Sequence, residues 1–314
     1  MAYYDFHNKV TWAGLNHGHW GAKLHLKRDG NEEFEEVVCP AFPREYDKSF
    51  VNFWCIASDS TGRVYVGAEP AALFYSDDLG QTWYLNEGLW NIHGREEWMG
   101  GGTDNPCLHS IQIEDSNPSH FYVAISCAGV AETLDRGKTW QYCNKGLTAD
   151  FMPDPSVEYG HDPHLLVMNQ ANPKELYQQN HCGIFKSVNG GESWDNLSEA
   201  EGVVSSFGFC VAVDEESTGT FYTIPGVSDE MRQAVDGALC VQKSIDGGMT
   251  FEAMRAGLPQ ENCFDIVYRH GLDYKHGVLL FGTTTGNMFL SCDSGHHWQK
   301  AFGEFPTVYS VQLI

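Results

Sequence analysis

An eight-residue phrase recurs along the chain and constrains its fold more than any other feature. The phrase reads Ser/Thr-x-Asp/Asn-x-Gly-x-x-Trp/Phe, and its five clear copies are SDDLGQTW, TLDRGKTW, SVNGGESW, SIDGGMTF and SCDSGHHW, starting at Ser76, Thr133, Ser187, Ser244 and Ser291. A degenerate copy, KRDGNEEF, starts at Lys27. The acidic or amide position advances by 47 to 57 residues between copies. Repeats of this length indicate one supersecondary unit per copy.

Each copy has the chemistry of a tight β-turn. The Asp or Asn side chain accepts hydrogen bonds from backbone N–H groups, and the glycine takes a conformation with φ above zero. We expect the hydroxyl to cap the other side of the turn and the aromatic ring to pack between neighbouring repeats. The carboxylates of these turns are therefore expected to be scaffold and not catalytic groups.

Alternating residues between the copies indicate short strands, four to a repeat. The clearest repeat has them at 107–114 (CLHSIQIE), 121–126 (FYVAIS), 130–134 (VAETL) and 141–146 (QYCNKG). The last repeat is expected to start its first strand at 265–270 (DIVYRH). Near the amino terminus only three strands are evident, at 10–16, 22–27 and 33–37. The carboxyl-terminal phrase VYSVQLI (308–314) offers the missing one.

The octet resembles the Asp-box (bacterial neuraminidase) repeat, which in known families joins the third and fourth strands of a propeller blade. The resemblance implies an all-β fold in which residues 1–314 form one six-bladed β-propeller domain. The ring is then expected to close through the carboxyl-terminal strand, which removes exposed sheet edges.

Longer phrases extend this resemblance over nearly the whole chain. AEPAALFYSDD, TADFMPDP, LYQQNHCGIF and FGTTTG are similar to a large, mainly bacterial family of Asp-box propellers labelled sialidase-like, BNR-repeat or glycosyl hydrolase proteins. Such relatives typically begin with one further blade, so seven blades are the alternative. A true sialidase needs three arginines around the substrate carboxylate. The eight arginines here lie mostly in boxes and loops, and we place Arg63 and Arg269 at the box end.

Composition excludes several kinds of partner. Lys and Arg total 19 against 42 acidic residues, a formal charge of −23, which disfavours nucleic acid and anionic membrane surfaces. The first residues, MAYYDFHNKV, lack the pattern of a signal peptide. The ten cysteines contain no CxxC pair, so we expect free thiols in a reducing cytoplasm. No nucleotide-binding motif occurs, and the sequence sets no oligomeric state.

In a propeller the first strands line a central channel, and the turns between second and third strands gather opposite the boxes. Aligning the first strands brings together one residue from each: Cys55, His109, His164, Cys210, Asp265 and Ser310. The turns add Glu69 and His181, while His161 and Asp162 directly precede a first strand. Long connections reach the same face and carry aromatic residues such as Phe151.

Convergence of imidazoles predicts a transition-metal site, with His109, His164 and His181 as first-choice ligands and His161 as the next. Iron, copper or zinc suits such donors, and a bound metal would polarise a substrate or lower the pKa of water. The plain alternative is that these side chains hydrogen-bond ordered water. Our leading interpretation is a small-molecule-binding propeller acting as a metal-dependent enzyme.

Two other functions stay open. A glycoside hydrolase needs only a suitably spaced carboxylate pair, for which Glu69, Asp162 and Asp265 are the candidate catalytic residues. Propellers also serve as non-catalytic platforms that bind a protein or a glycan.

Overall fold

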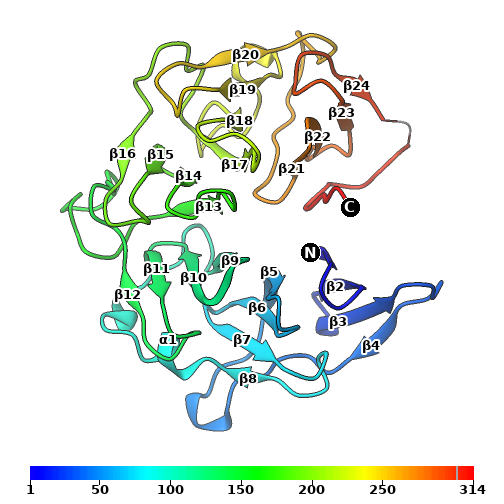
Figure 1. Ribbon diagram of the computed structural model, residues 1–314, viewed down its shortest axis with the longest axis vertical. Helices are drawn as coiled ribbons and strands as arrows, with labels where there is room; N and C mark the ends of the chain where they lie inside the picture. The colour runs from blue at the N-terminus through cyan, green and yellow to red at the C-terminus, as the bar shows by residue number, and fades with distance from the viewer. Residues whose placement is uncertain (302) are drawn as a thin grey trace. The chain divides into compact units, whose positions relative to one another are not determined.

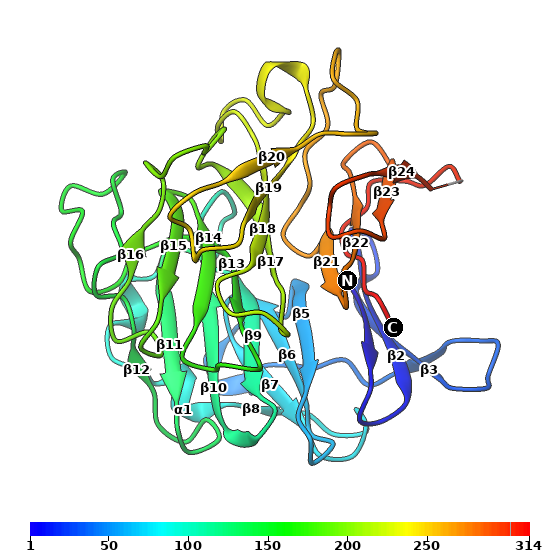
Figure 2. The same cartoon turned by 45° about the horizontal axis from the view of Figure 1, so that its top comes forward.

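The computed structural model describes residues 1–301 and 303–314, and its strands form six four-stranded antiparallel sheets. In each sheet the strands follow chain order, as expected when tight turns join sequential strands (Figures 1 and 2). This confirms the all-β class and the six repeats. The chain divides into two compact units, residues 1–143 with 158–162 and residues 144–157 with 163–314.

The first unit holds three sheets. The first contains β1 (Ala2–Asp5), β2 (Val10–His17), β3 (Gly21–Arg28) and β4 (Glu35–Val37). The second contains β5 (Asn52–Ser58), β6 (Val64–Glu69), β7 (Leu73–Ser76) and β8 (Tyr84–Leu85). The third contains β9 (Leu108–Glu114), β10 (Asn117–Ile125), β11 (Gly129–Thr133) and β12 (Gln141–Tyr142). Short helices lie in the connections: η1 (Arg44–Tyr46), α1 (Glu87–Trp90) and η2 (Arg95–Glu97).

The second unit holds the other three sheets. The fourth contains β13 (Pro163–Met168), β14 (Leu176–Asn180), β15 (Gly183–Ser187) and β16 (Asp195–Asn196). The fifth contains β17 (Gly208–Val213), β18 (Phe221–Pro225), β19 (Val241–Ser244) and β20 (Glu252–Met254), with η3 (Val235–Gly237) between β18 and β19. The sixth contains β21 (Leu272–Lys275), β22 (Val278–Gly282), β23 (Met288–Ser291) and β24 (Gln299–Lys300). None of the helices among the described residues is long and apolar enough to cross a membrane.

Successive sheets pack face to face within each unit. In the first unit β5 lies against β2 and β9, and in the second unit β17 lies against β13 and β21. The layers between sheets are apolar, with Trp12 and Phe74 in one core and Tyr222 and Phe281 in another. Burial of these large side chains from water is the main stabilising contribution to each unit.

The repeated octets form the expected turns. In the second sheet the Asp78 carboxylate accepts hydrogen bonds from the N–H (2.9 Å) and the hydroxyl (2.6 Å) of Thr82. The Ser76 hydroxyl accepts from the N–H of Gly80, whose φ is 78°. Trp83 packs edge-on against Trp12 of the neighbouring sheet. The box carboxylates are thus occupied by the turn, which confirms their role as scaffold.

Two predictions about strands at the chain ends are wrong. The first sheet supplies its own first strand, because β1 pairs with β2 from Ala2↔Ala13 to Asp5↔Val10. The carboxyl-terminal segment instead runs beside the sixth sheet, where Ser310 forms a parallel bridge with His270. The first strand of that sheet begins at Leu272 and not at residue 265, since a tight turn closes when the Gly271 N–H donates to the Tyr268 carbonyl.

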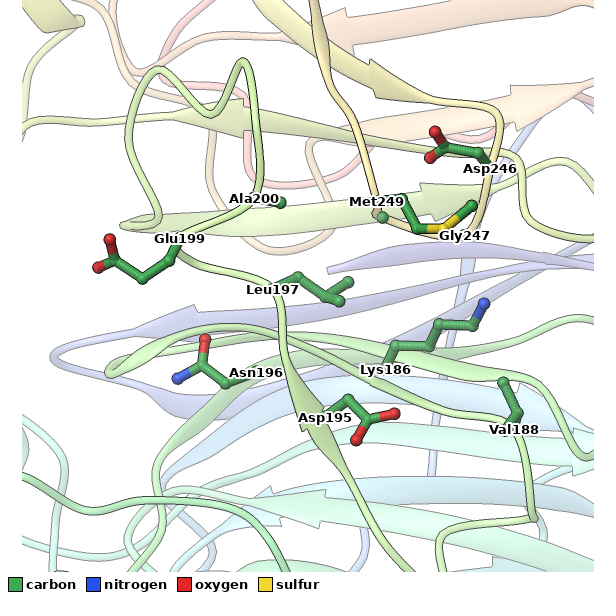
Figure 3. A pocket seen from close by; sticks show the side chains of 11 residues that line it. Lys186, Val188, Asp195, Asn196, Leu197, Glu199, Ala200, Asp246, Gly247 and Met249 are labelled. Carbon is green, nitrogen blue, oxygen red and sulfur yellow. The ribbon is translucent and has the colours of Figure 1, made fainter.

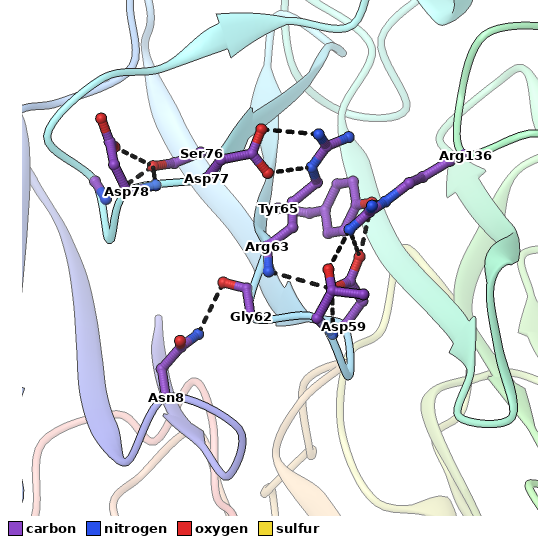
Figure 4. Close-up of polar contacts among 11 residues, drawn as sticks. Asn8, Asp59, Gly62, Arg63, Tyr65, Ser76, Asp77, Asp78 and Arg136 are labelled. Carbon is purple, nitrogen blue, oxygen red and sulfur yellow. Dashed lines mark hydrogen bonds and ion pairs between the residues drawn. The ribbon is translucent and has the colours of Figure 1, made fainter.

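A polar network ties turns together at the box end of the first unit (Figure 4). Arg63 makes a two-point ion pair with Asp77, at 2.6 and 2.8 Å. The Asn8 amide donates to the Gly62 carbonyl at 3.1 Å, which joins the first sheet to the second.

Candidate functional site

The centre of the candidate site is His164, the second residue of β13. Its side chain is buried, and its Nδ1 lies 2.6 Å from the carbonyl oxygen of Gly208 at the start of β17. A carbonyl can only accept, so Nδ1 carries the proton and donates it. The neutral ring therefore has its lone pair on Nε2, the form that ligates metals and accepts protons.

His181 is the second imidazole of the site and lies in the turn between β14 and β15. Its ring centroid is 5.6 Å from that of His164, with the ring planes perpendicular. Ring nitrogens of the two residues come within 4.8 Å of each other. The Asn180 side chain shapes the turn, since its Oδ1 accepts from the N–H of Cys182 at 3.0 Å. The predicted pairing of His164 and His181 is therefore seen within the second unit.

Aromatic rings enclose the two imidazoles. Phe209 stacks on His164 at 4.6 Å and 21°, Phe207 meets the His164 ring edge-on at 5.8 Å, and Phe151 meets His181 at 5.3 Å. Phe151 comes from one of the long connections, as the sequence predicts. Phe207 and Phe209 shield the buried His164 from water, whereas the exposed ring of Phe151 provides flat apolar surface beside the half-buried His181.

The electrostatics of the site keep His164 uncharged. Burial, followed by the positive charge of Arg269, lowers the pKa of His164 well below its usual value. The guanidinium carbons of Arg232 and Arg269 lie 5.3 and 5.4 Å from the centroid of the Phe209 ring. Placing Arg269 at the box end is therefore wrong. The expected strand at 265–270 does not form, and the turn at Tyr268–Gly271 leaves Arg269 beside Phe209.

The remaining predicted ligands belong to the first unit. His109 is buried in β9, where its ring lies 5.3 Å from that of Trp54. His161 and Asp162 are also buried, and the Asp162 carboxylate packs so closely that a Cβ on Gly101 would lie 3.0 Å from it. Their participation in a site with His164 stays a prediction.

The other two candidate carboxylates are Glu69 and Asp265, one in each unit. Glu69 ends β6 and is buried, and its Oε2 accepts from the Trp54 indole N–H at 3.3 Å. Asp265 precedes β21 on a loop; one of its oxygens accepts from the Thr285 hydroxyl and the other from the Asn287 amide at 2.9 Å. Asp265 thus contacts the turn between β22 and β23, although it does not lie on a strand as the sequence predicts.

A groove of about 410 Å³ that the sequence does not predict lies elsewhere in the second unit. It lies over β15, β16 and the turn between β19 and β20, and neither His164 nor His181 lines it. Figure 3 shows its acidic side chains, Asp195, Glu199 and Asp246, together with Lys186. Asp246 belongs to a box turn, so this part of the groove is scaffold.

Comparison with known proteins agrees with the fold seen here. The family model described as the BNR/Asp-box repeat matches residues 74–85. The GH74 enzyme of Niastella koreensis superposes with a TM-score of 0.64 at 14% identity, covering 93% of this chain and 44% of that one. The chain is a six-bladed β-propeller with BNR/Asp-box repeats. This confirms the resemblance noted from the octets.

Further solved propellers are similar at low identity. The GH74 xyloglucanase of Xanthomonas campestris gives a TM-score of 0.61 at 15% identity, with 94% of this chain and 44% of that chain covered. YCF48 from Cyanidioschyzon merolae gives 0.57 at 12% identity, with 96% and 83% covered. This propeller spans less than half the length of both GH74 enzymes, and at these identities the likeness concerns the fold alone. No curated protein matches the sequence.

The residues that sequence reasoning missed are Phe207, Gly208, Phe209 and Arg232. Gly208 acts through its carbonyl, which carries no side-chain signal, and Arg232 lies in a loop far from the histidines in sequence. The alternation of GFCVAV at 208–213 does indicate that Phe209 faces one side of a strand. It does not indicate which residue lies opposite.

Proposed function

We propose that this propeller binds a small molecule at His164 and His181 and holds a transition metal there as a metal-dependent enzyme. The observation that carries the proposal is the hydrogen bond from His164 Nδ1 to the Gly208 carbonyl. Because this bond keeps the proton on Nδ1, the lone pair of Nε2 is available to bind a metal. Metal-binding histidines commonly donate their second ring nitrogen to a carbonyl or carboxylate in this way.

The donor set fits iron, copper or zinc. Neutral imidazole nitrogens suit these metals, and burial keeps His164 neutral. Two histidines leave coordination positions for further ligands and for substrate. We propose His109, His161 and Asp162 as additional ligands; Asp162 is separated from His164 by Pro163 alone. A bound metal would supply Lewis-acid chemistry, while Phe207 and Phe209 shield the His164 ring from water.

Metal analysis of the purified protein tests this proposal. We expect close to one equivalent of iron, copper or zinc after reconstitution and its loss in H164A and H181A. H276A is the matched control, since His276 is exposed and pairs with Glu216. Less than about 0.1 equivalent in the wild-type protein, with no uptake on reconstitution, would overturn the proposal.

A second candidate function is glycoside hydrolysis by a pair of carboxylates drawn from Glu69, Asp162 and Asp265, all three of which are buried. The solved relatives described as GH74 enzymes support it through the fold alone. A panel of chromogenic glycosides tests it, with D265N expected to abolish any hydrolysis. Asn287→Ala, which removes one donor to Asp265, should lower the rate without abolishing it. Failure of both metal uptake and hydrolysis would leave a binding platform, as the solved complex of YCF48 with D1 peptide illustrates for that protein.

We propose that the protein works in a reducing compartment, namely the cytoplasm. What supports this is that none of the ten cysteines, all of which lie in the described part of the chain, forms a disulfide, and seven of them are buried. Thiol titration of protein purified without reductant should find ten groups after denaturation. A count of eight or fewer would indicate a disulfide and contradict the proposal.

A further inference from the structure

A buried glutamine touches both backbone segments that hold the two imidazoles. Gln179 lies in β14 with 1% of its surface exposed. Its amide nitrogen donates to the Ser206 carbonyl at 2.7 Å and lies 3.3 and 3.4 Å from the carbonyl oxygens of Gly183 and Asn180. Asn180 and Gly183 flank the turn that carries His181. The amide group therefore joins that turn to the connection that leads into β17.

The oxygen of the same amide lies against Gly208. A Cβ on Gly208 would lie 3.2 Å from Gln179 Oε1 and 2.7 Å from the Ile224 carbonyl oxygen. The carbonyl of Gly208 is the group that accepts the hydrogen bond from His164 Nδ1. One side chain thus lies beside the backbone that sets the tautomer of His164 and hydrogen-bonds to the backbone that presents His181.

We propose that Gln179 is a positioning residue for the His164–His181 pair, an inference that rests on the proposed function. A buried amide is stabilised only when its polar atoms find partners, so its position follows the carbonyls around it. Partners behind metal-binding histidines commonly change metal affinity by about 10- to 100-fold. Gln179 acts one step further out, through Gly208 and the His181 turn.

Gln242 in β19 offers a matched control. It is fully buried, its amide nitrogen donates to the Ser205 carbonyl at 3.1 Å and to the Thr223 hydroxyl at 3.0 Å, and its oxygen accepts from the N–H of Val204. It therefore hydrogen-bonds to the same connection into β17 as Gln179 does, but the hydrogen bonds described for it do not include one to the His181 turn. Replacing either glutamine by methionine keeps the side-chain length and removes the hydrogen bonds.

The first experiment titrates Co²⁺ into wild-type, Q179M and Q242M protein and follows the visible absorption of the bound ion. We expect Q179M to weaken Co²⁺ binding by about 10-fold or more and to change the band shape, whereas Q242M shifts affinity by less than about 3-fold. Both variants should lose stability in urea. Unchanged binding in Q179M, or equal weakening in both variants, would overturn the inference.

The second experiment needs no metal. Long-range ¹H–¹⁵N spectra of metal-free protein report the ring tautomer of each histidine, with His164 assigned through H164N. We expect one tautomer, protonated at Nδ1, in wild-type and Q242M protein, and a mixture in Q179M. A pure Nδ1–H tautomer in Q179M would contradict the inference, whether or not the wild type binds metal. If Q179M does not fold, Q179N, which is one methylene shorter, serves in both experiments.

Discussion

The guanidinium of Arg136 donates a hydrogen bond of 2.6 Å to the carboxylate of Asp59, 77 residues away in sequence. Arg136 occupies a variable position of the box turn between β11 and β12. Asp59 lies in the turn between β5 and β6 of the neighbouring sheet (Figure 4). The Asp59 side chain is completely buried. A box turn therefore stabilises the packing of adjacent sheets as well as its own hairpin.

We predict that R136A destabilises the protein by roughly 3 kcal/mol, because it leaves a buried carboxylate without its cation. The hydroxyl of Thr61 still donates to Asp59 in this variant. The loss of stability should therefore lie at the lower end of the range seen when one partner of a buried ion pair is removed. Urea unfolding at neutral pH measures it. D77N is the comparison: Asp77 is half exposed, and its loss should cost about 1 kcal/mol or less. Equal costs for the two variants would contradict this account.

A second prediction concerns Gly208. G208A places a Cβ 2.7 Å from the Ile224 carbonyl oxygen, so the start of β17 must move, at a cost of about 1 to 3 kcal/mol. The same movement should lengthen the hydrogen bond from His164. Unfolding curves and a crystal structure of the variant check both effects. G18A is the control, since nothing lies within 4 Å of its new Cβ, and its stability should match the wild type.

The third prediction concerns the stability of the protein at acid pH. Hydrogen bonds from the Thr250 backbone and hydroxyl lower the pKa of Asp246 from 3.8 to about 2. A carboxyl with a lowered folded-state pKa adds stability above its unfolded pKa, and that stability is lost as pH falls through the folded value. We expect the stability difference between wild type and D246N to shrink from about pH 4 down to about pH 2.

The box turn of the fourth sheet, between β15 and β16, supplies the reciprocal test, because it carries Asn189 in place of the aspartate. N189D should acquire a pH dependence of the same sign. Unfolding midpoints measured along an acid series compare the two variants. A constant difference between wild type and D246N across that series would show that the carboxylate charge contributes nothing to the turn.

The fourth prediction concerns His120, which lies between two carboxylates. Its Nδ1 is 2.7 Å from Glu114 and its Nε2 is 3.0 Å from Glu132. The hydrogen bond to Glu132, followed by that to Glu114, raises the pKa of His120. A raised folded-state pKa adds stability that is complete below the unfolded value of 6.5 and is lost as pH rises through the folded one.

H120Q should therefore differ most from the wild type below about pH 6 and approach it as the solution becomes alkaline. Thermal unfolding from pH 6 to pH 9 measures the trend. H276Q is the control, since its exposed ion pair with Glu216 should contribute little at any pH. A difference that grows with pH would refute the assignment of His120 as a charged group between Glu114 and Glu132.

The repeat made much of the fold predictable. A serine or threonine, an acid and a glycine at fixed offsets specify a turn locally, as Ser76, Asp78 and Gly80 do, and the turn identifies the strands on either side of it. The chain ends were less predictable. Four residues at Ala2–Asp5 form a strand that carries no turn signal, and VYSVQLI alternates well enough to resemble one. Pattern alone does not say with which strand such a segment pairs.

The chemistry of the site divides in the same way. The amino-acid sequence by itself determined the box turns and the choice of His164 and His181, because hydrogen bonds within a turn and the alternation of strands are local properties. Only the tertiary structure decided that Gly208 sets the tautomer of His164 and that Phe209 stacks on its ring. These contacts depend on how one sheet packs on the next, and that register is decided by side chains far apart in the chain, whose contacts no local pattern encodes.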